Sequence, residues 1–147
     1  MITTGQMRRH DARILALSAL FCWEISKDAP DAVFAQVVES YFEGSARFDY
    51  AKELFLSAVA HAGEIDPLLA KASQGWPLPR MPRVDLSILR LAVAEAIYLG
   101  KTPDEVVIDE ALELSKEFST HASPRFVNGV LVAVFREMGH AKKASKE

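Results

Sequence analysis

Apolar residues recur every three or four positions along most of the chain, which is the spacing of one face of an α-helix. In the first such segment, from about residue 7 to residue 26, the apolar stripe consists of Ala12, Leu15, Ala16, Ala19 and Trp23. No segment shows the residue-by-residue alternation that is typical of a half-buried strand. The pattern therefore predicts an all-α protein.

The same spacing predicts six further helices. We expect them at about residues 32–42, 49–62, 66–72, 83–99, 103–118 and 124–135. Gly44 is expected to end the second helix, because glycine adopts the left-handed conformation found there. Residues 74–82 read QGWPLPRMP, with three of the seven prolines, and are predicted to be a linker. We therefore expect a single domain over residues 1–147, with two halves at about 7–73 and 83–139.

The last two predicted helices begin with the same arrangement, a hydroxyl residue followed by proline. Thr102 precedes Pro103, and Ser123 precedes Pro124. A hydroxyl can accept a hydrogen bond from the first turn, where proline loses no helical bond. Glu105 lies three residues after Thr102, as in a capping box. We expect both hydroxyls to cap their helices, and Phe118 to close a buried stripe on the sixth.

Residues 124–135 are apolar on nearly all sides, which predicts a buried, central helix. Asn128 and Gly129 interrupt this pattern, and glycine inside a helix costs about 1 kcal/mol relative to alanine. The favoured interpretation is a close approach of another helix at Gly129, with Asn128 bonded to a neighbour. A ligand-binding role for the two residues is the alternative.

Positive charge gathers at the N-terminus of a chain whose net charge is −3, from 17 basic and 20 acidic residues. Arg8, Arg9 and Arg13 stand there against one acid, Asp11, and His10 can add charge near neutral pH. Net acidity argues against a protein that coats nucleic acid with its whole surface. A basic helix end instead indicates a local site for an anion.

Arg13 and Phe21 lie on one predicted helical stripe, eight residues apart. An arginine that binds phosphate and a ring that stacks on a base are together typical of single-stranded nucleic-acid recognition. The alternative is that Phe21 belongs to the core and the arginines form a solvated helix end. The pattern alone leaves both interpretations open.

The sequence shows no pattern of a catalytic, metal or cofactor site. It has no glycine-rich phosphate loop and no CxxC, and its four histidines are not at metal-ligand spacing. The single cysteine, Cys22, is expected to be a packed small residue. Glu110, Glu113 and Glu117 share a helix face and are expected to be solvated. No apolar run is long enough to span a membrane. We therefore predict neither an enzyme nor a membrane protein, and no cofactor or metal.

Three blocks of sequence resemble the NusB family. They are RHDAR at residues 9–13 with a following Phe21 and Trp23, ILRLA at 88–92 after Asp85, and PRFVNGVL at 124–131. The resemblance implies an all-α fold of about seven helices in two three-helix-bundle-like halves. It also implies a transcription antitermination factor of the cytoplasm, which binds boxA-type single-stranded RNA of ribosomal RNA leaders. The implied protein partners are the ribosomal small-subunit protein NusE and the RNA polymerase antitermination complex.

Particular residues follow from this resemblance together with the charge pattern. The expected RNA-binding residues are Arg8, Arg9, His10, Arg13, Phe21 and Phe126. Asp85 matches an acidic position associated with NusE binding. His10 and Asp11 stand where the family often has further arginines, so the basic motif is thinner here.

Two alternatives to this function follow from the same features. The FVNGVL string also occurs in NusB-like accessory domains of ribosomal RNA cytosine methyltransferases, where it implies an RNA-binding role beside a catalytic domain. A self-associating helical protein is the other alternative, because the family includes dimers, and a homodimer could cover the basic helix.

Overall fold

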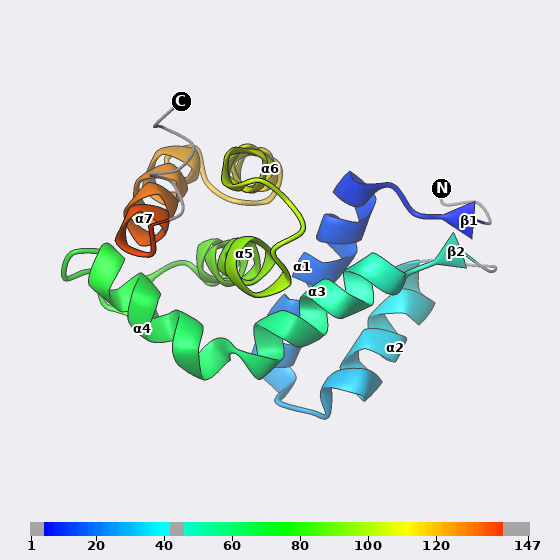
Figure 1. The fold of residues 1–147 in the computed structure, drawn as a ribbon. Coiled ribbons are helices and arrows are strands. Elements are labelled where there is room, and N and C mark those ends of the chain that lie inside the picture. Colours follow the sequence, from blue (N-terminus) through cyan, green and yellow to red (C-terminus); the bar gives the residue numbers. More distant parts are fainter. Residues whose placement is uncertain (1–4, 42–45, 140–147) are drawn as a thin grey trace.

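The computed structural model describes residues 5–41 and 46–139 (Figure 1). The all-α prediction is confirmed. The α-helices are α1 (Arg9–Ser26), α2 (Pro30–Tyr41), α3 (Asp49–Ala60), α4 (Ala62–Ala72), α5 (Arg83–Val93), α6 (Asp104–Phe118) and α7 (Ser123–Glu137). A 3-10 turn, η1 (Leu78–Arg80), precedes α5, and a π-helix, η2 (Ala94–Leu99), continues it.

Two very short strands hold the chain beside the start of α1. Strands β1 (Gly5–Gln6) and β2 (Ala46–Arg47) pair in parallel, with Gly5 opposite Ala46. Strand β1 leads into α1 and β2 into α3 (Figure 1). The N-terminal ends of α1 and α3 therefore lie on the same side of the molecule.

The central helix is α5, and not α7 as its sequence predicted. All residues from Asp85 to Ala96 are buried, and Figure 1 shows α5 between α1 and α3 on one side and α6 and α7 on the other. Helix α7 instead has a polar face. Its exposed side chains include those of Arg125, Asn128 and Arg136. These positions fall on one helical stripe. The segment is therefore an amphipathic helix, although most of its residues are apolar.

Gly129 lies on that exposed face, which overturns the expected close helix contact. A Cβ atom placed at Gly129 meets nothing within 4 Å apart from its own helix and chain neighbours. Asn128 is exposed as well. Packing therefore gives no reason for a glycine at this position.

The π-helix that follows α5 turns one buried side chain toward α1 and α3. It ends at Gly100, which has φ +66°, and the Gly100 N–H donates to the Glu95 carbonyl at 3.0 Å, five residues back. Such wide turns are rare and are often found at functional positions. Here the turn contains Glu95, a buried carboxylate.

Residues 74–82 form no α-helix, in agreement with the predicted break. Gln74 and Gly75 both have positive φ, and η1 occupies the middle of the segment. The partition into two halves stays a prediction, because α1 packs against α5 as well as against α2 and α3. Buried residues from all seven α-helices form one hydrophobic core.

Neither expected hydroxyl caps its helix. The Thr102 hydroxyl donates to the Glu95 carboxylate at 3.0 Å, and the Ser123 hydroxyl donates to Asp85 at 2.9 Å. Buried acceptors on α5 and η2 thus bind these hydroxyls in place of the first-turn N–H groups. Phe118, expected in the buried stripe of α6, is 43% exposed. Gly44, expected to end the second helix, lies outside the described residues.

Candidate nucleic-acid interface

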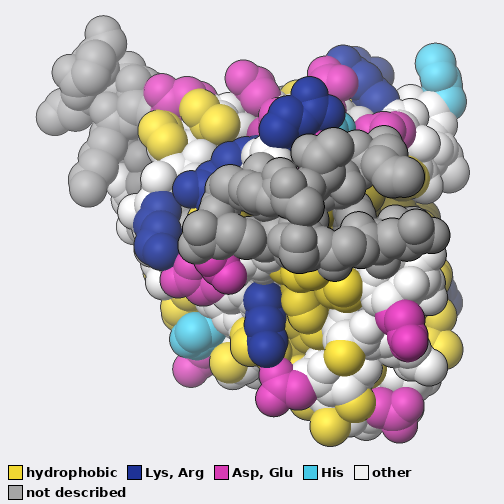
Figure 2. Space-filling view, turned by 90° about the vertical axis from the view of Figure 1, so that its right-hand side faces the viewer, with side chains coloured by type: hydrophobic (Ala, Val, Ile, Leu, Met, Phe, Trp, Pro, Cys, Tyr) yellow, Lys and Arg dark blue, Asp and Glu magenta, His cyan; other side chains and the backbone are white. Residues whose placement is uncertain are grey.

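Two arginines at the start of α1 lie at the surface. Arg8 is exposed and pairs with Asp11 at 3.2 Å, one turn along the helix. Arg9 is also exposed, and its guanidinium carbon lies 3.6 Å above the centre of the Tyr50 ring of α3. Figure 2 shows the side of the molecule that carries these helix ends. Lys and Arg side chains there alternate with Asp and Glu side chains, above an area of hydrophobic side chains.

His10 faces α6 from the first turn of α1. Its Nδ1 atom lies 3.1 Å from the Glu110 carboxylate, and its Nε2 atom lies 3.7 Å from that of Glu117. The glutamate face of α6, expected to be merely solvated, therefore borders the start of α1. These carboxylates reduce the positive potential next to His10, because opposite charges at such distances attract.

Arg13 does not share the surface with its neighbours. Its side chain is 6% exposed and forms a two-pronged ion pair with Glu95, with Nη2 to Oε2 at 2.7 Å and Nε to Oε1 at 2.9 Å. Its Nη1 atom lies 3.5 Å from Glu110. Burial alone would lower the pKa of Arg13, but its hydrogen bonds with Glu95 and the charges of Glu95 and Glu110 raise it. The expected direct RNA contact by Arg13 is therefore incompatible with this structure.

Glu95 is the centre of a buried polar cluster that we call the Glu95 cluster: Arg13, Tyr50, Glu95 and Thr102. The Tyr50 hydroxyl donates to Glu95 at 2.7 Å. Burial and the contact with Glu95 raise the pKa of Tyr50 to about 12. The four residues come from α1, α3, η2 and the turn before α6, so the cluster joins segments that lie far apart in the sequence. Breaking such a buried pair from one side is costly, typically 3–5 kcal/mol.

Phe21, farther along α1, is half-buried. It lines a hollow of about 210 Å³ together with Leu17, Ser18, Cys22, Val84 and Phe118. The ring thus borders a surface depression between α1 and α6, and Cys22, expected to be packed, is exposed beside it. Arg13 and Phe21 follow one stripe, as predicted, but the arginine end of that stripe is covered.

Phe126, on α7, lies beside a second hollow and far along the chain from α1. Its ring centre is 5.6 Å from that of Trp76, at an angle of 49°. The two rings line a hollow of about 220 Å³ with Pro82, Asp85, Thr120, Ala122 and Ser123. Trp76 is 50% exposed. An aromatic pair with one open side is a surface on which a base or an apolar side chain can stack.

Asp85 is buried, at 2% exposure, and cannot meet a protein partner directly. Its carboxylate accepts hydrogen bonds from the Ser119 and Ser123 hydroxyls. Those serines bracket the turn between α6 and α7. The expected partner-binding role at this position is therefore wrong as a direct contact, and the carboxylate instead fixes that turn.

Sequence reasoning missed Tyr50, Glu95 and Arg90. Arg90 is buried and pairs with Asp66 and Glu24, each at 2.8 Å. Its pKa, which burial would lower, is raised by these two carboxylates. A charged residue inside an apolar stripe, as at positions 90 and 95, is the signal that would have indicated buried ion pairs. Nothing in the local pattern distinguishes Tyr50 from other core residues.

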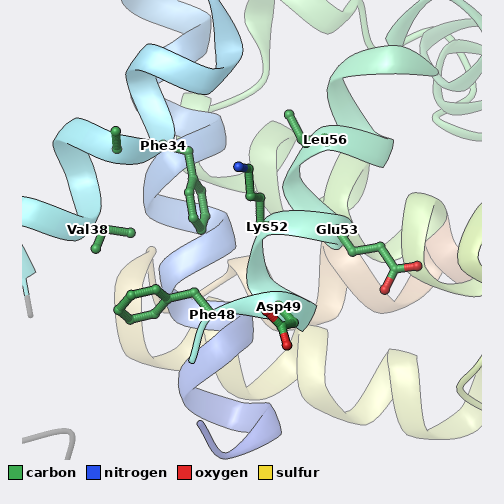
Figure 3. Close-up of a pocket in the computed structure, with 8 residues that line it drawn as sticks. Phe34, Val38, Phe48, Asp49, Lys52, Glu53 and Leu56 are labelled. Atoms are coloured by element: carbon green, nitrogen blue, oxygen red, sulfur yellow. The ribbon is translucent and has the colours of Figure 1, made fainter. Parts of the chain in front are cut away.

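A further hollow lies on the side of the molecule formed by α2 and α3. It measures about 600 Å³, lies between α2 and α3, and is lined by Phe34, Ala35, Val38, Phe48, Asp49, Lys52, Glu53 and Leu56. Figure 3 shows aromatic and aliphatic side chains on its walls, with Lys52 and Glu53 on α3. Within residues 5–41 and 46–139, no group of three or more acidic, histidine or cysteine side chains is placed to hold a metal ion. None of the described helices is long and apolar enough to cross a membrane.

These features define the class of the protein: a seven-helix domain with exposed arginines at one helix end and open aromatic rings on another face. Comparison with known proteins then places it. The NusB family model matches residues 10–136, and the chain belongs to this family.

Named relatives agree with this placement. The transcription antitermination protein NusB of Desulforamulus reducens is 40% identical over 125 residues, which cover 85% of this chain and 87% of the relative. The NusB protein of Symbiobacterium thermophilum is 41% identical over 150 residues, which cover 95% of this chain and 97% of the relative. A crystal structure of the antitermination factors NusB and NusE with double-stranded RNA contains a chain that superposes with a TM-score of 0.78. That chain is 32% identical, and the match covers 89% of this protein and 99% of that chain.

Proposed function

We propose that this protein is a transcription antitermination factor that binds boxA-type single-stranded RNA of ribosomal RNA leaders together with NusE. It acts without catalysis, as an adaptor between RNA, NusE and the RNA polymerase antitermination complex in the cytoplasm. The observation that carries the proposal is the exposed arginine pair at the start of α1, in a chain whose relatives are named antitermination proteins. A related chain was crystallised with both NusE and RNA.

The surface arginines are the RNA-binding groups in this proposal. Arg8 and Arg9 approach the phosphates, with His10 beside them on the first turn of α1. Phe21 and Phe126 offer half-buried rings at two hollows for bases. Arg13 holds α1 in place through Glu95 and does not touch RNA.

NusE is proposed to bind a surface whose shape depends on Asp85. Because Asp85 ties Ser119 and Ser123 together, it fixes the turn that leads into α7 and to Phe126. A partner that contacts this turn would respond to changes at Asp85 without meeting the carboxylate itself. The names of the relatives favour this adaptor over the methyltransferase accessory domain.

The experiment is an RNA titration in the presence and absence of purified NusE. The proposal predicts that a boxA-type single strand binds, that NusE raises its affinity, and that a strand of scrambled sequence gains much less. A duplex of the same sequence is the third arm, because the related complex contains double-stranded RNA. If NusE does not change the affinity for any of the three, the adaptor role is wrong. Sedimentation of the free protein separately tests the homodimer that the sequence left open.

A further inference from the structure

Arg9 and Tyr50 form a stack in which the arginine is the outer layer. The guanidinium carbon lies 3.6 Å above the centre of the ring, a contact distance at which the cation is attracted to the ring face. Tyr50 is 6% exposed, whereas Arg9 is exposed. The inner face of the guanidinium is therefore covered by tyrosine, and the arginine itself is presented to solvent.

The tyrosine beneath Arg9 is held from below. Its hydroxyl donates to Glu95 at 2.7 Å, and Glu95 is itself bound by Arg13 and Thr102. The ring thus belongs to a buried cluster from four elements and cannot turn away without breaking it. A long arginine side chain normally loses much rotamer freedom on binding. Here the stack on Tyr50 has already removed part of that freedom.

The charge of Arg9 is also uncommitted among the described residues. Its guanidinium forms no ion pair with a described carboxylate, whereas Arg8 pairs with Asp11 and Arg13 with Glu95. A guanidinium has donors along its edge and a flat face above and below. In RNA recognition such a face stacks on an unpaired base, while the edge donors bind phosphate.

We propose that the Arg9–Tyr50 stack is a preformed platform for one unpaired nucleobase of single-stranded RNA, with the base as the third layer on Arg9. The inference rests on the proposed RNA-binding function and assigns Tyr50 as a positioning residue of that site. Arg8, which contacts no aromatic ring among the described residues, acts as a point charge. Lysine should therefore be a poor substitute for Arg9, because it keeps the charge but lacks the flat guanidinium face.

The test compares Arg9→Lys with Arg80→Lys, a control at an exposed arginine outside the proposed RNA site, using single strands that carry 2-aminopurine at one position at a time. Both variants keep the charge, so both should keep the salt dependence of wild type. Arg9→Lys should lose roughly tenfold in affinity, the order of one base stack, and should lose the fluorescence quenching at one nucleotide position. Arg80→Lys should bind and quench as wild type does. Wild-type affinity and quenching in Arg9→Lys would overturn the platform.

Two substitutions at Tyr50 separate the ring from its hydroxyl. Tyr50→Phe keeps the ring and should keep the quenching, whereas Tyr50→Leu should lose it even at RNA concentrations that restore full binding. Thermal melting shows whether each variant is folded, and the surface variant Arg9→Lys decides the question if Tyr50→Leu is not. If wild type binds no single strand at all, the proposed function fails and the platform with it. If wild type binds and Arg9→Lys matches it, only the platform fails.

Discussion

At the scale of single residues, two buried carboxylates organise the polar interior. The Glu95 carboxylate accepts hydrogen bonds from Arg13, Tyr50 and Thr102. The Asp85 carboxylate accepts them from two serine hydroxyls. Neither is a surface group, although the sequence placed Asp85 at a partner-binding face. A single sequence marks such positions only as charges within an apolar helix, and cannot say which distant residue neutralises them.

Replacing Asp85 with alanine should destabilise the protein by about 1–3 kcal/mol, because the Ser119 and Ser123 hydroxyls would lose their buried acceptor. Urea unfolding measures the change. Asp109→Ala is the matched control, since Asp109 is exposed on α6 and its loss should cost about 0.5 kcal/mol or less. Equal stability of the two variants would contradict the role assigned to Asp85.

Tyr50 should make stability fall at high pH. Its pKa is raised from 10.0 to about 12, so the folded state holds the phenol proton more tightly than the unfolded chain does. The resulting stabilisation is fully present below pH 10 and is lost as the pH rises through 12. The difference in unfolding free energy between wild type and Tyr50→Phe should therefore shift against wild type over this range, by up to about 2–3 kcal/mol. A difference that does not change between pH 9 and 12 would show that Tyr50 titrates normally.

At the scale of elements, helical periodicity located the helices but not their ends or their faces. The stripe predicted for α1 packs into the core, with Trp23 partly buried, because apolar spacing decides which face packs. The capping residues were wrong, since Thr102 and Ser123 are bound by carboxylates from other helices. The sequence predicted α7 as the central helix although α5 is, because three polar positions on one stripe are outnumbered by their apolar neighbours.

Gly129 offers a direct test of the face assigned to α7. Because the position is exposed, helical and open, Gly129→Ala should stabilise the protein by about 0.5–1 kcal/mol. Gly100→Ala is the contrasting variant: with φ +66° it should destabilise, because alanine is strained there. Thermal melting of both variants gives the answer. Destabilisation by Gly129→Ala would restore the close helix contact that the sequence suggested.

At the scale of the whole molecule, the candidate RNA surface depends on contacts that no local pattern records. The basic motif of α1 was evident in the sequence, but its third arginine, Arg13, is buried and paired with Glu95, 82 residues away. Arg9 stacks on the Tyr50 ring of α3, and Phe126 contacts Trp76 from the segment between α4 and α5. The sequence identified the residue types and the helix that carries them. Which of them remain at the surface is decided by tertiary packing.

The central claim is that RNA binds at the start of α1, and the salt dependence of binding tests it most directly. The measurement compares wild type, Arg8→Ala/Arg9→Ala and Arg80→Ala/Arg83→Ala on one boxA-type single strand over a range of salt concentrations. Each phosphate contact on a single strand contributes about −0.7 to the slope of log K against log salt. The account predicts that the α1 double variant, still folded, loses affinity and flattens the slope by up to about 1.4, while the second double variant resembles wild type. An unchanged affinity and slope in the α1 variant, with losses in the other, would move the RNA site to the segment before α5.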